Sequence, residues 1–113
     1  MPSAEYWNAL DQLIESSRIE IDRPAGSIHP RHADVIYPLD YGYLVDTRVA
    51  DGAGVDVWIG TAGHRRLVGL IMTVDASKRD VEQKLLLGCT NGECRTLEAF
   101  HTGGGQTGWL LTR

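Results

Sequence analysis

The chain of 113 residues is long enough for one domain with a hydrophobic core. Its net charge of −4 and pI of about 5.4 argue against a nucleic-acid-binding protein, which usually carries a basic patch. No run approaches the roughly 18 apolar residues that a membrane helix needs, and the N-terminus lacks a secretory signal pattern. We therefore expect a single domain over 1–113, in the cytoplasm, that binds neither nucleic acid nor membrane.

The first predicted element is a helix over residues 3–17. Apolar residues recur at helical spacing between Tyr6 and Ile14, which indicates one buried stripe. Residues 18–22 then alternate between apolar and charged side chains, as is typical of a half-buried strand. A proline and a glycine follow and predict a turn.

The middle of the chain is predicted to be mostly β-structure. Segments rich in β-branched and aromatic residues alternate there with turn residues. The strands expected from this pattern are 34–38, 41–45, 55–60 and 66–75. Residues 83–89 can form either a strand or a buried helix segment.

The last quarter of the chain predicts a second helix. Thr90 is followed three residues later by Glu93, which fits a capping box, and glycines that begin at Gly103 end the helix. A final short strand is expected over 108–113. Many short strands between two helices indicate a mainly β, α+β fold that is a small barrel or a curled sheet.

The two cysteines favour no metal site or disulfide. Cys89 and Cys94 are five positions apart, which is not the spacing of a zinc knuckle. In a reducing compartment, free thiols that are at least half buried are the expected state.

Acidic residues gather around the predicted turns and strand ends. Carboxylates are the ligands that Mg²⁺ prefers, and they repel one another unless cations lie among them. The alternative is that these are solvated turn residues, and composition and spacing alone favour that alternative. The positions concerned are Glu20, Asp51, Asp56, Asp75, Asp80 and Glu82.

Tyrosines recur just before the acidic loop, at Tyr37, Tyr41 and Tyr43. Their phenol groups can donate hydrogen bonds to phosphate or orient a water molecule. For any one of them, aromatic packing in a small core is the more ordinary explanation.

Three segments in the same order resemble the family I (soluble, magnesium-dependent) inorganic pyrophosphatases. Residues 37–60, YPLDYGYLVDTRVADGAGVDVWIG, resemble the family signature Y-P-x-N-Y-G followed by D-G-D-P-[LV]-D-V. RIEIDR at 18–23 and RLVGLIMTVDASKRDVEQKLLL at 66–87 resemble two further family segments. The resemblance implies an OB-like five-stranded β-barrel with an N-terminal helix, a short C-terminal helix and a site at one mouth. It also implies Mg²⁺, or Mn²⁺ in its place.

The resemblance also implies roles for individual residues. The implied catalytic residues are Tyr41, Asp56 and Lys84. The implied substrate-binding residues are Arg18, Arg31, Tyr41 and Lys84. The implied metal ligands are Glu20, Asp51, Asp56, Asp75 and Glu82, with Asp80 as the rival of Glu82 for the last position.

The acidic loop and the end of the chain depart from the family pattern. Ala53 stands where the family has the carboxylate that activates the attacking water, and loss of such a base commonly costs on the order of 10²–10⁴ in rate. The C-terminal segment lacks the Tyr-Lys pair of the family. Whether Arg95 or His101 replaces this pair stays open, and His29 and His32 are expected to be surface loop residues.

Three functions are compatible with these observations. The first is hydrolysis of pyrophosphate or a related phosphoanhydride by an activated water. The others are binding of a phosphorylated ligand or protein partner without hydrolysis, and hydrolysis of another phosphate compound. The resemblance covers 18–87, so an N-terminal helix (1–17) and a divergent C-terminal segment (88–113) flank a family-like core. A homo-oligomer is a further expectation, and the first helix either serves it or caps the barrel.

Overall fold

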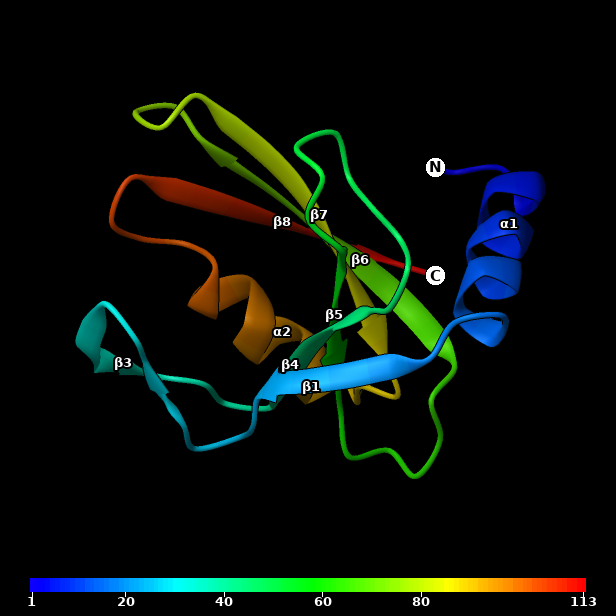
Figure 1. Cartoon of the computed structure of the whole chain (residues 1–113), viewed down its shortest axis with the longest axis horizontal. Helices are drawn as coiled ribbons and strands as arrows, with labels where there is room; N and C mark the ends of the chain where they lie inside the picture. The colour runs from blue at the N-terminus through cyan, green and yellow to red at the C-terminus, as the bar shows by residue number, and fades with distance from the viewer.

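A computed structural model describes all residues, 1–113. One six-stranded sheet with the strand order β1-β4-β5-β7-β6-β8 forms its centre (Figure 1). Neither helix is long and apolar enough to cross a membrane. The elements are α1 (Ala4–Glu15), β1 (Ile19–Arg23), β2 (Ile28–His29), β3 (His32–Ile36), β4 (Asp40–Leu44), β5 (Val55–Ile59), β6 (Leu67–Asp75), β7 (Asp80–Leu87), α2 (Asn91–Phe100) and β8 (Gln106–Thr112).

The mainly β, α+β class is confirmed, but a closed five-stranded barrel is not. The sheet has six strands, and β1 and β8 form its two edges. The sixth strand arises because the chain returns after α2 and pairs β8 antiparallel along β6, from Gly69↔Thr112 to Asp75↔Gln106. The only parallel pair is β5 with β7, and it joins only residues 57–59 to 85–87.

Most of the expected elements are present. Residues 83–89, which the sequence left open, belong mainly to strand β7. The capping box of α2 is formed as expected, and Glu93 also accepts hydrogen bonds from the backbone and hydroxyl of Thr61. The segment expected at 34–38 instead pairs as β3 with the short β2, and this hairpin extends beyond the central sheet (Figure 1). Both cysteines are free and buried.

Strand alternation gives the sheet two different faces, and one helix packs on each (Figure 1). The apolar stripe of α1, with Trp7 at its centre, covers one face. The buried residues of that cluster are Trp7, Leu44, Val57, Ile59, Leu67, Leu70, Leu85 and Leu87. On the other face, Leu97 of α2 packs against a second cluster around the fully buried Trp58. The face covered by α2 also carries the polar residues of the candidate site.

Candidate functional site

A row of polar side chains crosses four strands on the α2 face of the sheet. Glu20 of β1 lies opposite Tyr43 of β4, and Tyr43 lies opposite Asp56 of β5. Because Val57 aligns with Leu85 in the parallel pair, Lys84 of β7 lies next to Asp56. Directly opposed residues point to the same face of a sheet, so the strand register alone brings these four residues together.

Lys84 is the centre of this row, and its side chain is only 7% exposed. Its ammonium donates hydrogen bonds to the Tyr41 hydroxyl at 3.0 Å and to Asp56 Oδ2 at 2.8 Å. It also donates to Glu82 Oε2. An ammonium has three N–H donors, so each donor of Lys84 has an acceptor. The structure therefore brings together four of the predicted site residues.

The protonation states in this cluster follow from burial and charge. Burial alone lowers the pKa of Lys84, but Tyr41, Asp56 and Glu82 together outweigh it and raise the pKa. Burial raises the pKa of Tyr41 against the opposing effect of Lys84. At neutral pH the cluster contains an ammonium and a neutral phenol.

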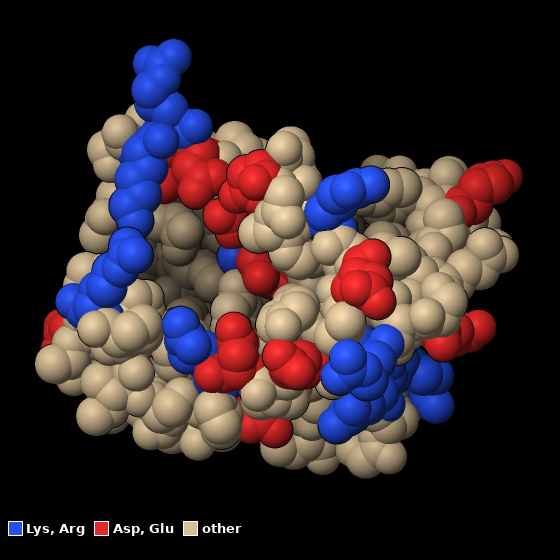
Figure 2. All heavy atoms as spheres, viewed as in Figure 1, with Lys and Arg blue, Asp and Glu red and all other residues tan.

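An acidic cleft of about 550 Å³ opens beside this cluster, between the β4–β5 loop and the first half of β7. It forms because β5 pairs with β7 only from Val57 onwards, so the loop before β5 diverges from β7. The carboxylates that line it are Asp51, Asp56, Asp80 and Glu82. The nearby Glu82 charge, followed by burial, raises the pKa of Asp80. Figure 2 shows a hollow on the viewed face, with acidic side chains gathered on one side of it.

Ala53 also lines the acidic cleft. Its backbone N–H donates to Asp51 Oδ1 at 2.9 Å, so the aspartate stabilises the loop as well as facing the cleft. Ala53 brings no oxygen to the cleft. The position at which this sequence differs from the resembled family, Ala53, therefore lies in the wall of the acidic cleft.

The remaining predicted residues lie outside the acidic cleft. Glu20 accepts a hydrogen bond from the Tyr43 hydroxyl at 2.7 Å and lies 3.9 Å from Arg18. Arg31 is exposed in the turn between β2 and β3. Asp75, at the end of β6, accepts hydrogen bonds from the Ser77 hydroxyl and the Lys78 backbone, so it shapes the β6–β7 turn.

A second cavity, of about 580 Å³, is lined by aromatic rings and polar groups, and Tyr41 belongs to its lining whereas Lys84 does not. Its lining includes His29, His32, Tyr37, Tyr41, Trp58, Asp75, Lys78, Phe100 and His101. His101 is buried at the end of α2, where its Nε2 accepts a hydrogen bond from the Trp58 indole at 3.0 Å. The sequence left the role of His101 open, because a helix end before glycines gives no sign of a partner 43 residues away.

We expect His101 to make stability depend on pH. Burial, followed by the Lys84 charge, lowers the pKa of His101 from 6.5 to about 4. Its stabilising contribution is complete above pH 6.5 and is lost as the pH falls towards 4, because only the unfolded state takes up the proton. Between pH 7 and pH 5 the free energy of unfolding should fall by about 2 kcal/mol from this group.

Urea denaturation at pH 7 and pH 5 measures this loss. His101→Gln keeps an acceptor for Trp58 but cannot be protonated, so most of the pH dependence in this range should disappear. The exposed His32→Gln variant is the matched control and should keep it. An unchanged pH dependence in His101→Gln would contradict the assignment.

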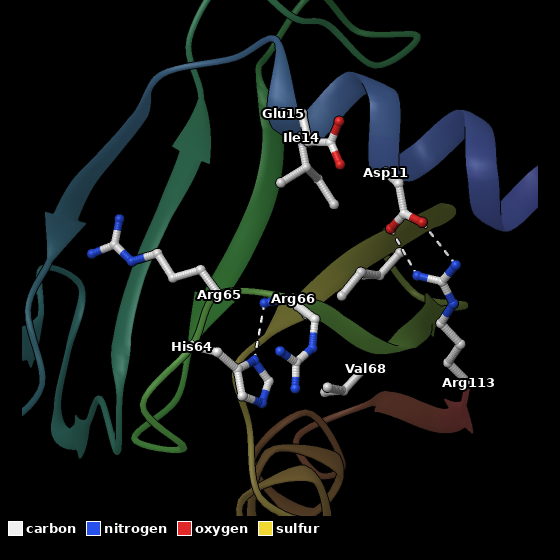
Figure 3. A pocket seen from close by; sticks show the side chains of 9 residues that line it. Asp11, Ile14, Glu15, His64, Arg65, Arg66, Val68 and Arg113 are labelled. Carbon is white, nitrogen blue, oxygen red and sulfur yellow. Dashed lines mark hydrogen bonds and ion pairs between the residues drawn. The ribbon is translucent and has the colours of Figure 1, made fainter.

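A third cavity, of about 580 Å³, lies between α1, the loop before β6 and the end of β8 (Figure 3). Arg113 pairs there with both carboxylate oxygens of Asp11, at 2.7 and 2.8 Å. The Arg66 backbone donates to His64 Nδ1, and the Arg65 side chain points away from the others. None of the predicted site residues lines this cavity, so it is not part of the candidate site.

Comparison with solved structures identifies bacterial proteins of the same fold. An inorganic pyrophosphatase from Neisseria gonorrhoeae superposes with a TM-score of 0.59 at 18% identity, over 79% of this chain and 77% of that chain. An inorganic phosphatase from Anaplasma phagocytophilum gives 0.56 at 15% identity, over 83% and 81%. This chain shares their fold. No protein-family model and no curated protein matches the sequence.

The residues of the acidic cleft fit a divalent cation only in part. Asp51, Asp56 and Glu82 of the implied ligand set line the cleft, whereas Glu20 and Asp75 do not. Asp56 and Glu82 each have one oxygen bonded to Lys84. No group of three or more His, Cys, Asp or Glu side chains is arranged to hold a metal ion. The cleft therefore does not fit a divalent ion that bridges Asp56 and Glu82.

Proposed function

We propose that this protein hydrolyses pyrophosphate or a related phosphoanhydride at the acidic cleft. The observation that carries the proposal is the buried cluster of Tyr41, Asp56, Glu82 and Lys84 beside that cleft, in a chain with the fold of a bacterial inorganic pyrophosphatase. A fold hosts many activities, so the proposal depends on the cluster as well as on the fold.

Asp56 is the residue of this chain best placed to accept a proton from water. Its carboxylate lines the cleft, and Lys84 fixes its orientation through Oδ2. A carboxylate held in this way can act as a general base within the cleft. Lys84 and Tyr41 act as positioning residues in this proposal, because all three donors of the ammonium are already used.

The substrate needs cations to enter an acidic cleft. Pyrophosphate is highly negative, and four carboxylates line the cleft, so free pyrophosphate would be repelled. We propose that it enters as a complex with Mg²⁺ or Mn²⁺, which neutralises the phosphate oxygens. Arg79 also lines the cleft and can contribute positive charge to the phosphates.

Phosphate release from pyrophosphate, with Mg²⁺ or Mn²⁺, tests the proposal. We expect slow turnover in the wild type, because Ala53 supplies no carboxylate. Asp56→Asn should lower the rate by about 10²-fold or more, since it removes the proposed base. Ala53→Asp should raise the rate. Asp46→Asn is the matched control, because it is the same substitution at a position outside the cleft. This variant should hydrolyse pyrophosphate at the wild-type rate.

The test substitution in the β4–β5 loop should be made at position 53 alone. A Cβ at Gly54 would lie 2.8 Å from Cδ2 of Tyr43, so a larger residue there would disturb the neighbouring strand. Absence of phosphate release from both the wild type and Ala53→Asp would contradict hydrolysis of pyrophosphate.

The second candidate function is binding of a phosphorylated ligand or protein partner without hydrolysis. The specific observation in its favour is Ala53 in the wall of the cleft, where the family resemblance implies a carboxylate that activates water. Binding of a non-hydrolysable pyrophosphate analogue by calorimetry, without phosphate release, would favour it. Under either function we propose a small phosphate-containing ligand and a cytoplasmic location. A homo-oligomer and hydrolysis of a different phosphate compound stay predictions.

A further inference from the structure

The position of Lys84 is unusual for a lysine in a phosphate-binding site. Its ammonium is not directed at open space where a phosphate could contact it. It lies instead between two carboxylates, Asp56 and Glu82, with the Tyr41 hydroxyl as a third oxygen neighbour. One positive group surrounded by three oxygens is the arrangement that a bound cation also requires.

A divalent ion cannot share this position with the ammonium. Mg²⁺ needs its oxygen ligands at about 2.0–2.1 Å, and Lys84 already lies 2.8 Å from Asp56 Oδ2. The ammonium also lowers the negative charge that would attract a second cation. Asp56 and Glu82 carry −2 together, and Lys84 changes the total to −1. The Lys84 ammonium therefore fills the space that a bridging ion would need and neutralises part of the negative charge that would attract it.

Burial holds the Lys84 ammonium in its position between Asp56 and Glu82. The Lys84 side chain is almost fully covered by neighbouring residues. Moving the ammonium away would leave it without acceptors in a poorly solvated position, which costs several kcal/mol. A divalent cation that competes for the same oxygens must overcome this cost.

We propose that Lys84 is a built-in cation that takes the place of a divalent ion between Asp56 and Glu82. The inference rests on the proposed function only in treating the cleft as the place where cations and phosphate meet. The wild-type cleft binds a free divalent cation weakly, through the carboxylates that Lys84 leaves available, Asp51 and Asp80. Removal of the Lys84 charge opens a stronger site between Asp56 and Glu82.

Binding of Mn²⁺ alone, followed by calorimetry and by electron paramagnetic resonance, tests this proposal. Lys84→Met should bind Mn²⁺ at least about tenfold more tightly than the wild type, since two freed carboxylates face one another. The chain has one other lysine, Lys78, and Lys78→Met is the matched control for loss of one positive charge. It should bind Mn²⁺ within about twofold of the wild type. Equal or weaker binding by folded Lys84→Met would overturn the proposal.

Lys84→Met is also expected to show cation-dependent stability. Its thermal midpoint should rise with Mn²⁺ by more than that of the wild type, because the ion replaces the lost ammonium. If the variant is unfolded without metal, folding on addition of Mn²⁺ supports the proposal.

Glu82→Gln in the wild-type background gives a test that does not depend on the folding of Lys84→Met. Glu82 is already bonded to Lys84, so this change should leave Mn²⁺ binding within about twofold. A drop of fivefold or more would mean that Glu82 is a free metal ligand, and it would overturn the proposal. Phosphate release is measured separately, so loss of the proposed hydrolysis would leave these binding results intact.

Discussion

Replacement of Gly42 by alanine is expected to destabilise the protein by at least about 3 kcal/mol or to prevent folding. A Cβ at this position would lie 1.9 Å from the backbone oxygen of Glu20 and 2.9 Å from Cα of Ile21. The clash is with backbone atoms of β1, so no side-chain movement relieves it. The pairing Ile21↔Gly42 would have to separate, and with it the edge of the sheet that carries Glu20.

Gly92→Ala is the matched control, and its expected effect has the opposite sign. Gly92 lies in the first turn of α2, where a Cβ would meet nothing nearer than Thr90 Oγ1 at 4.0 Å. Alanine is favoured over glycine in a helix, so stability should rise by up to about 1 kcal/mol. Urea denaturation of both variants provides the comparison. A Gly42→Ala variant within 1 kcal/mol of the wild type would contradict the close approach of the two strands.

Simultaneous replacement of Asp56 by Asn and Glu82 by Gln is expected to cost about 3–5 kcal/mol of unfolding free energy. The two changes leave a buried ammonium with no counter-charge. Lys84→Met should cost less, because the side chains of Asp56 and Glu82 are 30% and 38% exposed and can regain water.

The triple variant with Asp56→Asn, Glu82→Gln and Lys84→Met separates this effect from a loss of packing. With the buried charge removed, it should regain most of the stability that the double variant loses. Chemical denaturation at pH 7 of the wild type, Lys84→Met, the double variant and the triple variant measures the four free energies of unfolding that are compared. Equal stabilities of the double and triple variants would show that Lys84 does not depend on its carboxylate partners.

The local structure of this protein could be predicted well from its sequence. The apolar period before residue 17 indicated α1, and Thr90 with Glu93 indicated the start of α2, because both signals depend on neighbours along the chain. Strand pairing could not be predicted in the same way. The return of β8 along β6 and the short parallel contact of β5 with β7 depend on residues far apart in sequence, and the closed barrel is not confirmed.

The sequence pointed to four residues that lie together in the structure, but it did not predict their contacts. The resemblance pointed to Tyr41, Asp56 and Lys84, and the strand register brings them together. It also suggested that Lys84 contacts substrate, whereas its ammonium is used within the protein. Two-residue spacing on β7 places Glu82 and Lys84 on one face, but it does not specify that they bond to each other.

The buried lysine makes the charge balance of this site a property of the fold. A magnesium ion occupies its site by mass action, so its occupancy follows the concentration of the free ion and is lost to a chelator. A lysine is covalently part of the chain, so its place between Asp56 and Glu82 cannot be lost to a chelator. The contacts of Lys84 within the cluster thus need no cation from outside the protein, whereas the proposed hydrolysis would still depend on the supply of Mg²⁺ or Mn²⁺.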